Sequence, residues 1–263
     1  MQDVIAITNR RLCDRPFLEQ IERVCKLYPA AVILREKDLS DAEYAALAAD
    51  VYSVCKKYNV RLILHTYVAV AEKTGINAIH LSIDNLRKYH SQLKDSNVAI
   101  KGCSIHSVQE AGGNVSVVQE FFSILSPFHG REYFDLCKKY NTVFQTYGVL
   151  EEGFLTSPAF MDREFAKTDI RSRIPWTDPE KKEGLCRAFE IWKPLCEEYH
   201  CSFATLVEAW ALSQYDRMSL LVGMRKASSV EDTVKCLDIR LRAEDIKCME
   251  EAVKTIQVAV LDK

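Results

Sequence analysis

The segment VAIKGCSIHSVQEAGGNVSVVQEFFSIL, residues 98–125, decides how the chain folds. It contains two runs rich in apolar and β-branched residues, Val98–Ser104 and Val117–Leu125, which we predict to be buried strands. The connection between them ends in Ala111-Gly112-Gly113-Asn114, and because paired glycines break a helix, only about one to two helical turns fit there. A crossover between parallel strands usually needs about a dozen residues or more. The two strands are therefore expected to be parallel and joined by a crossover at the lower limit of length.

Short strands and longer helical patterns alternate in the same way through the rest of the chain. Eight strands close a (β/α)₈ barrel, and such a barrel usually takes about 250 residues. The chain has 263 residues, so the sequence predicts an α/β fold consisting of one TIM barrel over residues 1–263. The predicted strands are Val4–Thr8, Ala31–Arg35, Arg61–His65, Ala78–Ser82, Val98–Ser104, Val117–Leu125, Val143–Tyr147 and Ser219–Gly223.

Capping residues predict where several helices begin and end. Ser40 precedes an acidic first turn, and Asp178 precedes a proline, so each is expected to cap a helix N-terminus. Ser228 and Ser229 offer a cap for a helix over Val230–Leu237. A long loop is expected over residues 156–177. Helices should stop at Asn59, Gly75 and Asn141.

Composition and charge exclude several classes of protein. The chain is 48% hydrophobic and 27% charged, as in globular proteins and unlike disordered chains. Its formal net charge of −2 gives no electrostatic case for a nucleic acid or an anionic membrane as partner. No uninterrupted apolar stretch approaches about 18 residues, and the N-terminus lacks the order of a signal peptide. Nothing in the sequence indicates the oligomeric state.

Cysteine usage points to the compartment. The ten cysteines include no C-x-x-C pair, so they do not form a zinc or redox motif. Without an export signal they are expected to be reduced thiols that serve as small core or half-buried residues. We therefore expect a cytoplasmic protein.

Five short sequence motifs in the first part of the chain resemble those of the thiamin-phosphate synthase/TenI family. They occur in the order and spacing of that family over residues 1 to about 111, and together they are specific. The resemblance implies the first five strands of a (β/α)₈ barrel. The motifs are IAITN (5–9), LREKDL (34–39), LILH (62–65), AIHL (78–81) and GCSIHSVQEA (102–111).

The second part of the sequence is similar to the C-terminal part of an aldo-keto reductase, another (β/α)₈ barrel. The matching motifs are VQEFFS (118–123), TYGVLEEGFL (146–155), FATLVEAW (203–210), VGMRK (222–226) and SVEDT (229–233). They extend over about 115–258 and imply strands six to eight. Both families carry Gly-x-Ser on the fifth strand, here Gly102-Cys-Ser104. We interpret the chain as a barrel recombined at the fifth strand, naturally or by engineering, with parts 1–111 and 115–263 and a seam at 112–114.

Side chains at the C-terminal ends of the strands are the candidates for a binding site, because active groups of such barrels stand there. The cationic members favour a phosphorylated small molecule, since Arg and Lys bind phosphate through charge-assisted hydrogen bonds. Two alternatives stay open: residues 35–38 could be a solvated turn with mutual ion pairs, and His80 could be a buried, hydrogen-bonded residue. The candidate substrate-binding residues are Arg35, Lys37, His65, Asp84 and Ser104.

The resemblance to the TenI branch implies a proton-shuttling thiazole phosphate isomerase with His106 as general acid and base. A histidine titrates near neutral pH and suits this role, although a loop histidine that caps a helix is the alternative. The magnesium-dependent synthase pattern is broken: Ile33 and Ile83 stand where glutamines are expected, and His65-Thr66 replaces Asn-Asp. The Asp of that pair binds Mg²⁺, so we expect no metal site.

The resemblance to aldo-keto reductases implies a groove for NADP. Its residues here would be Gln119 for the nicotinamide amide, Phe122 as the stacking aromatic, and Arg225 with Lys226 near the 2′-phosphate. Ser228 and Ser229, at the start of the following helix, could accept a phosphate. Ordinary barrel packing is the alternative for Gln119 and Phe122. Because half of the groove comes from another family, we expect NADPH to bind weakly.

Three functional hypotheses follow. The first is a barrel that binds a phosphorylated small molecule with weak or no turnover. If the barrel is catalytic, the second is a TenI-like isomerase or an activity like that of thiamin-phosphate synthase. The third is an NADP-dependent, aldo-keto-reductase-like oxidoreductase that lacks its Tyr, Lys, Asp and His tetrad, since none of those motifs is present in the first part.

Overall fold

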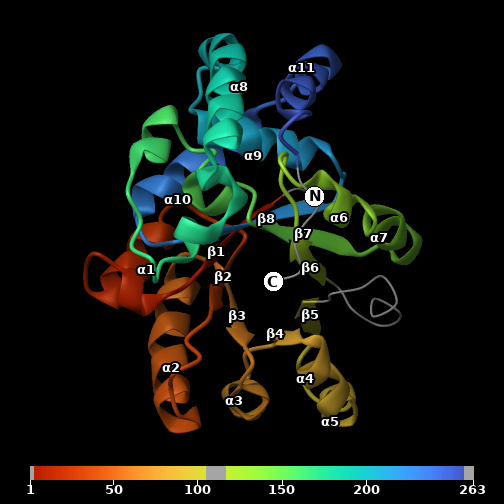
Figure 1. Ribbon diagram of the computed structural model, residues 1–263. Helices are drawn as coiled ribbons and strands as arrows, with labels where there is room; N and C mark the ends of the chain where they lie inside the picture. The colour runs from red at the N-terminus through yellow and green to blue at the C-terminus, as the bar shows by residue number, and fades with distance from the viewer. Residues whose placement is uncertain (1–2, 105–116, 258–263) are drawn as a thin grey trace.

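The computed structural model describes residues 3–104 and 117–257, and in these ranges eight parallel strands close into one barrel (Figure 1). Each strand pairs with its neighbours in sequence, and β8 pairs with β1 to complete the circle. The predicted α/β barrel is confirmed. The strands are β1 (Asp3–Ile7), β2 (Ala31–Leu34), β3 (Arg61–His65), β4 (Ala78–Ser82), β5 (Ile100–Ser104), β6 (Val117–Phe121), β7 (Val143–Tyr147) and β8 (Met218–Gly223).

The predicted strand bounds are wrong at β6. The prediction extended this strand to Leu125, but it ends at Phe121, and the chain then turns through Ser123 and Ser126, whose backbone N–H donates to the Ser123 carbonyl at 3.2 Å. Ile124 and Leu125 in this turn are fully buried. A buried turn and a buried strand have the same apolar composition, so hydrophobicity could not separate them.

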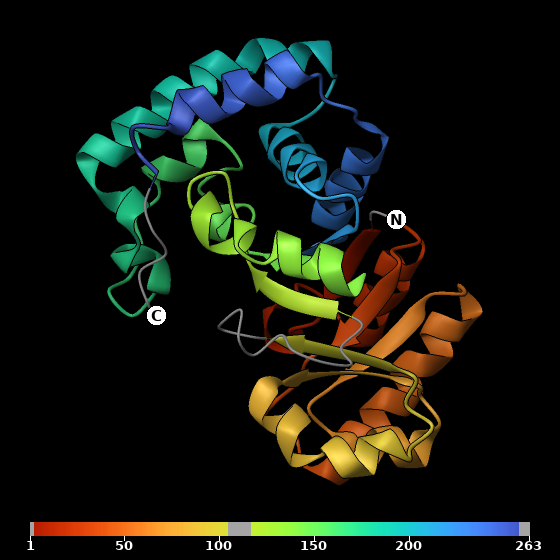
Figure 2. The ribbon, with the colours of Figure 1, turned by 90° about the vertical axis from the view of Figure 1, so that its right-hand side faces the viewer.

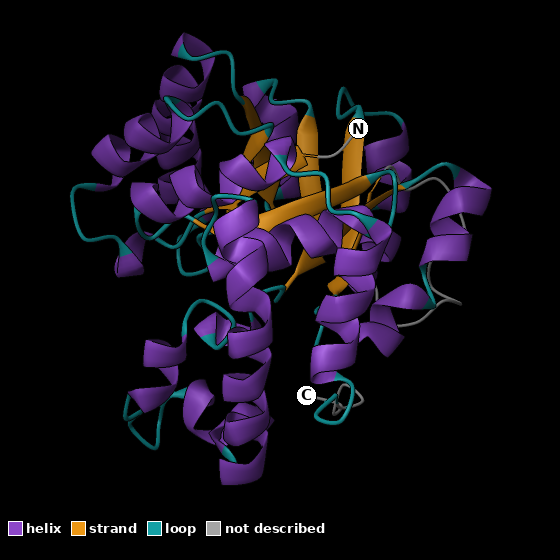
Figure 3. Cartoon of the chain, turned by 90° about the horizontal axis from the view of Figure 1, so that it is seen from above, coloured by secondary structure: helices purple, strands orange, loops and turns teal. Residues whose placement is uncertain are grey.

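Helices surround the strands on the outside of the barrel (Figure 3). The predicted loop at 156–177 contains the short 3₁₀ turns Pro158–Asp162, Ile170–Arg173 and Pro175–Thr177. Further 3₁₀ turns are Arg10–Leu12, Glu151–Gly153 and Lys235–Asp238. The helices are α1 (Phe17–Cys25), α2 (Asp41–Lys57), α3 (Val68–Thr74), α4 (Ile83–Lys88), α5 (His90–Lys94), α6 (Pro127–Arg131), α7 (Phe134–Tyr140), α8 (Pro179–Glu198), α9 (Phe203–Ser213), α10 (Ala227–Val234) and α11 (Ala243–Val253).

The expected caps form at two of the three predicted helix starts. Ser40 accepts from the backbone N–H of Glu43 in a capping box, and Asp178 accepts from two backbone N–H groups at the start of α8. The expected stops also form, with left-handed backbone at Asn59, Gly75 and Asn141. The prediction is wrong for Ser228 and Ser229, because α10 begins at Ala227 and both serines lie inside its first turn.

The interior of the barrel is divided by polarity. Ile5, Ala31 and Ile33 are buried against one another on the side of β1 and β2. On the side of β4 to β7, the interior carries polar side chains, among them His80, Gln119 and Gln145. The polar part of the interior therefore extends toward the C-terminal ends of the strands. This end of the barrel, the mouth, is where the candidate binding residues were predicted.

Outside the barrel, the apolar core forms two clusters that follow the two parts of the chain. The first packs α1, α2 and α3 against β1 to β4, and the second packs the helices that follow β6 and contains all three tryptophans. In Figure 2, the orange and yellow helices of the first part cover one side, and the green to blue helices of the second part cover the other. The ten cysteines are free thiols, five of them buried, whereas Cys186 is exposed. None of the described helices combines the length and apolar character needed to span a bilayer.

Candidate functional site

A chain of hydrogen-bonded polar side chains crosses the interior from β4 to β7. Nε2 of His80 lies 2.8 Å from Oγ of Ser104, which donates to Oε1 of Gln119 at 3.1 Å. Nε2 of Gln119 in turn donates to Oε1 of Gln145 at 2.5 Å. His80 is 3% exposed, so the interpretation of this residue as a buried, hydrogen-bonded histidine is confirmed.

Gly102 makes room for the His80 ring. A Cβ atom at residue 102 would lie 2.7 Å from Nδ1 of His80, closer than real Cβ contacts come. Residues 80 and 102 are partners in the β4–β5 register, so both face the interior. The glycine of the Gly-x-Ser motif therefore has a steric role next to the polar chain.

Basic side chains gather at the ends of β2 and β3. The pKa of His65 is lowered to about 3, mainly by burial and then by the charges of His80, Lys37 and Arg35. Burial and the neighbouring Arg35 also lower the pKa of Lys37. The β2–β3 register pairs Leu34 with Leu64, so Arg35 and His65, each the next residue along the chain, lie at neighbouring strand ends, and Lys37 follows Arg35 by two residues.

The acidic residues of the same segment pair elsewhere. Glu36 is 3% exposed and accepts hydrogen bonds from Oγ1 of Thr8 at 2.7 Å and from Nη1 of Arg10 at 2.9 Å. Asp38 pairs with Arg10 at 2.5 Å and with Arg11 at 2.8 Å. The alternative of mutual ion pairs within residues 35–38 is therefore wrong. Among the described residues, no carboxylate lies within ion-pair distance of Arg35 or Lys37.

The backbone is strained next to this cluster. Thr66 follows β3 with a φ of +75°, a conformation that is unfavourable for a β-branched residue. Its Oγ1 lies 2.8 Å from Nδ1 of His65, and its backbone N–H donates to the carbonyl of His80 at 3.0 Å. Such strain costs roughly 1–3 kcal/mol and concentrates at functional sites.

The remaining TenI-type candidates are placed differently. Ser104 is half-buried and belongs to the polar chain. Asp84 is exposed in the first turn of α4 and makes no hydrogen bond or ion pair with another described residue, so the structure does not join it to the basic cluster. His106 lies outside the described residues, and its role stays a prediction.

Phe122 cannot stack on a cofactor at the mouth, and this prediction is wrong. Its ring is fully buried, stacked on Trp210 at 5.2 Å and edge-on to Phe134 and Phe144. Gln119 faces the interior, so alternation along β6 places residue 121, not 122, on the same side. Strand alternation from Gln119 was the sequence signal that could have corrected the assignment.

The aromatic residues at the mouth are Phe121 and Tyr147. Their ring centroids lie 5.8 Å apart in an edge-to-face arrangement, and Tyr147 is 37% exposed. Tyr147 donates to Oε1 of Glu120 at 3.3 Å. Burial, followed by the Glu120 charge, raises the pKa of Tyr147 to about 12. The phenol is therefore neutral at physiological pH.

Arg225 and Lys226 are exposed between β8 and α10. Neither forms an ion pair with any described residue, and Lys226 occupies the N-cap position of α10 without a side-chain cap. Ser228 and Ser229 are exposed in the first turn. The segment therefore offers two free cations beside a helix N-terminus that no side chain caps.

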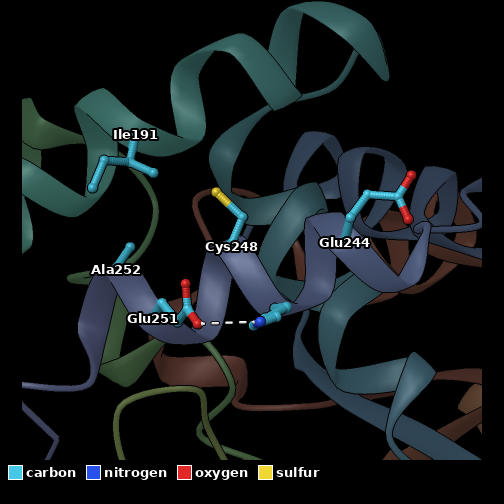
Figure 4. Close-up of a pocket in the computed structure, with 6 residues that line it drawn as sticks. Ile191, Glu244, Cys248, Glu251 and Ala252 are labelled. Atoms are coloured by element: carbon cyan, nitrogen blue, oxygen red, sulfur yellow. Dashed lines mark ion pairs between the residues drawn. The ribbon is translucent and has the colours of Figure 1, made fainter.

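Two hollows lie near the ends of elements in the second part of the chain. One, of about 230 Å³, is bordered by the turn after β7, the end of β8 and residues of α9 and α10. Sequence reasoning missed its residue Glu208, the one charged residue of helix α9. The other is an open groove between α8 and α11 that contains Ile191 and the ion pair of Lys247 with Glu251 at 3.8 Å (Figure 4). No strand end borders this groove, so it is separate from the mouth. Across the ranges 3–104 and 117–257, no three His, Cys, Asp or Glu side chains come together as a metal site.

Two family models match the chain, one for each part. The model described as thiamine monophosphate synthase matches residues 4–118, and that of the aldo/keto reductase family matches residues 79–254. The two matches overlap over residues 79–118. The predicted seam at 112–114 falls inside this overlap and outside the described residues, so its position stays a prediction.

Relatives of both kinds are found. The NADH-specific methylglyoxal reductase of Escherichia coli (strain K12) is 31% identical over 145 residues, which cover 55% of this chain and 44% of the relative. The thiamine-phosphate synthase of Caldanaerobacter subterraneus subsp. tengcongensis is 33% identical over 113 residues, which cover 41% of this chain and 53% of the relative. The chain spans about half the length of these curated relatives.

Solved structures share the whole fold. A glycerol dehydrogenase from Gluconobacter oxydans superposes with a TM-score of 0.66 at 17% identity, covering 98% of this chain and 93% of the other. An aldose reductase from Giardia lamblia superposes with a TM-score of 0.61 at 10% identity, covering 97% of this chain and 93% of the other. At this identity the likeness concerns the fold alone. The reductase model covers more than half of the chain, so the protein belongs to the aldo/keto reductase family and carries an N-terminal part that matches thiamine monophosphate synthase.

Proposed function

We propose that the protein binds a small phosphorylated molecule at the ends of β2 and β3, with weak or no turnover. The observation that carries this proposal is the separation of charges in residues 35–38. Glu36 and Asp38 pair with Arg10 and Arg11, whereas Arg35 and Lys37 keep no counter-ion among the described residues. Two unpaired cations beside a neutral imidazole suit a phosphate, which takes charge-assisted hydrogen bonds from Arg and Lys.

The state of His65 supports an anionic ligand. With its pKa lowered to about 3, the imidazole is neutral at pH 7 and can donate or accept a hydrogen bond without adding charge. Arg35 and Lys37 then supply the positive potential by themselves. Burial and then repulsion from Arg35 lower the pKa of Lys37, and a bound phosphate would offset that repulsion.

The two phenol groups near this cluster support weak turnover. Tyr44 donates to the carbonyl of Leu34 at 2.6 Å and accepts from the backbone N–H of His65 at 3.0 Å. Tyr67 donates to the carbonyl of Leu39 at 2.6 Å. Because both phenols are used by the backbone, neither is poised to transfer a proton to a ligand. The TenI-like isomerase with His106 as general acid and base remains the proposal for any catalysis.

Arg35→Ala is expected to weaken binding of a thiazole phosphate ester ten- to hundredfold. Losing a charge-assisted contact costs about 1.5–3 kcal/mol, which corresponds to that change in Kd. Isothermal titration calorimetry measures the Kd, with the unphosphorylated alcohol as the ligand control. Arg217→Ala is the protein control, since it removes the same charge just before β8, at the opposite end of the barrel. Equal Kd values for the Arg35 variant and the parent protein would refute the proposed site.

A second candidate function, a nicotinamide-dependent oxidoreductase, is favoured by the free cations after β8. Arg225 and Lys226 stand beside the N-terminus of α10, where a phosphate of a dinucleotide gains both charge and backbone N–H donors. Tyr147, at the mouth, takes the place that we had assigned to Phe122 as the aromatic next to a nicotinamide ring. The first-part strands carry none of the family's tetrad motifs, so this activity would be weak.

The double variant Arg225→Ala, Lys226→Ala is expected to weaken NADPH binding about ten- to hundredfold. The reason is the loss of the charge-assisted contacts to the phosphate groups. Fluorescence titration of NADPH measures the affinity, and NADH, which lacks the 2′-phosphate, is the ligand control. An unchanged NADPH affinity would remove this segment from the cofactor site.

A further inference from the structure

Three helices of the barrel end in the same six-residue pattern, Cys-x-x-Tyr-Asn/His-x. The fifth residue of each copy has left-handed backbone, with φ of +56° at Asn59, +52° at Asn141 and +50° at His200. The backbone N–H of the sixth residue then donates to the carbonyl of the cysteine, at 2.9 or 3.0 Å. This is a Schellman motif, which brings the side chain of the sixth residue next to that of the first. The three copies are CKKYNV (55–60) at the end of α2, CKKYNT (137–142) at the end of α7 and CEEYHC (196–201) at the end of α8.

The copy at the end of α8 differs from the other two in its sixth residue. Val60 and Thr142 fill this position after α2 and α7, where both side chains of the contact are buried. After α8 the position holds a second thiol, Cys201, and both Cys196 and Cys201 are half-buried. The turn therefore places two thiols in contact where a small solute can reach them. A search for C-x-x-C spacing does not find this pair, because only the backbone turn brings the two cysteines together.

We propose that Cys196 and Cys201 form a modification site, which a small hydroperoxide oxidises to a reversible disulfide at the junction of α8 and α9 (Figure 1). The site lies on helices outside the barrel and does not depend on the phosphate site at β2 and β3. A disulfide requires two Cα atoms about 4.4–6.8 Å apart and side chains that face each other. The backbone hydrogen bond between the two residues closes the turn, and the thiols already interact, so the disulfide needs no rearrangement of the helices.

The two thiols have different roles in the oxidation. Cys196 donates a hydrogen bond to Cys201, and this bond lowers the pKa of the Cys201 thiol against the opposite effects of burial and the Asp232 charge. The same hydrogen bond, followed by burial, raises the pKa of the Cys196 thiol. Because the thiolate is the nucleophile, Cys201 attacks the peroxide and Cys196 then closes the disulfide.

The oxidation consumes one hydrogen peroxide for each pair of thiols. The Cys201 sulfur attacks one peroxide oxygen, so an S–O bond forms and the O–O bond breaks, and the hydroxide that leaves becomes water with the proton of the thiol. The Cys196 sulfur then attacks the Cys201 sulfur, so the S–S bond forms and the S–O bond breaks, and the second hydroxide leaves as water with the Cys196 proton. The two thiols lose two electrons and two protons in total, and the peroxide is reduced to two water molecules. A dithiol reductant reverses the modification.

Hydrogen peroxide is the probe, added to the reduced wild-type protein after removal of the reductant. Trypsin releases both cysteines in one peptide, residues 188–217, because Lys193 is followed by a proline. After treatment with iodoacetamide, the reduced peptide carries two labels, whereas the oxidised peptide carries none and lacks the mass of two hydrogen atoms. We expect the two thiols of this peptide to be lost together, at least about tenfold faster than the buried thiols. Dithiothreitol should restore both of them.

Two variants test the role of each thiol. Cys201→Ser removes the attacking thiol, so the loss of the Cys196 thiol should be at least about tenfold slower. Cys196→Ser keeps a hydroxyl donor beside Cys201 but removes the thiol that closes the disulfide. In this variant Cys201 should stop at the sulfenic acid, which dimedone labels. Mass spectrometry of the same tryptic peptide measures both results.

The chain contains a matched control for contact between thiols without exposure. The Sγ atoms of Cys25 and Cys55 lie 3.9 Å apart between α1 and α2, and both residues are fully buried. This pair should stay reduced under the same conditions. Two free thiols in the peptide 188–217 after peroxide treatment, or oxidation of Cys25 and Cys55 at the same rate, would overturn the proposal. So would a disulfide of either α8 thiol with the exposed Cys186 or with a second molecule, or a loss of thiols that dithiothreitol does not reverse.

Discussion

Replacing Phe122 by alanine is expected to lower the free energy of unfolding by about 3–5 kcal/mol. The ring is fully buried in the core of the second part, stacked on Trp210 at 5.2 Å and edge-on to Phe134 and Phe144. Removing it deletes a large apolar surface and leaves a cavity among aromatic rings that cannot collapse easily. Urea unfolding, followed by tryptophan fluorescence and circular dichroism, measures the loss.

Phe121→Ala is the matched control, one residue away. Phe121 faces the mouth and is only half-buried, so its removal should cost markedly less stability. Because it borders the mouth with Tyr147, the same variant should change ligand binding more than the Phe122 variant does. If Phe122→Ala left stability unchanged and weakened NADPH binding, the placement of this ring in the core would be wrong.

These two neighbours show where the sequence was informative and where it was not. The bounds of the strands could be predicted within about two residues, except for the end of β6, because short β-branched runs between helical patterns seldom indicate anything other than a strand. Which face a side chain takes depends on the register, and a shift of one residue moves it from the mouth to the core. The reductase-like motif VQEFFS contains two adjacent phenylalanines, Phe121 and Phe122. Only the interior position of Gln119 shows which of them faces the mouth and which faces the core.

The basic cluster was predictable in part. The rule that functional groups stand at strand ends identified Arg35, Lys37 and His65. It failed for Asp84, which the start of α4 carries away from the cluster into solvent. The pairing of Glu36 with Arg10 depends on contacts between residues 26 apart, and local sequence does not encode them. Glu208 was missed for a similar reason, because only the packing of α9 against α10 and β8 reveals that its carboxyl group is enclosed.

The stability of the Glu208→Gln variant is expected to depend on pH more strongly than that of the parent protein. His65 and His80 have pKa values lowered to about 3 and about 4, mainly by burial. Between these values and about 6.5 the unfolded chain binds more protons than the folded chain. Their contribution to stability is therefore present above pH 6.5 and lost as the pH falls. At pH 5, each of the two histidines lowers the free energy of unfolding by about 2 kcal/mol relative to its value above pH 6.5.

Glu208 acts with the opposite sign. Its pKa is raised to about 8 by burial, so the folded chain binds the extra proton between about pH 4.5 and pH 8. This contribution is present below pH 4.5 and is lost as the pH rises through 8. Between pH 7.5 and pH 5, protonated Glu208 adds about 3 kcal/mol to the free energy of unfolding. This gain offsets most of the loss from the two histidines.

The substitution Glu208→Gln removes this compensation while keeping the size of the side chain. The variant is expected to lose about 4 kcal/mol of stability between pH 7.5 and pH 5, whereas the parent protein loses only about 1 kcal/mol. Urea unfolding at the two pH values measures the difference. Glu152→Gln should follow the parent protein, because that carboxylate is exposed in the folded chain. A Glu208 variant whose stability changed no more than that of the parent would show that residue 208 does not hold its proton in the folded state, because the opposing contribution would not exist.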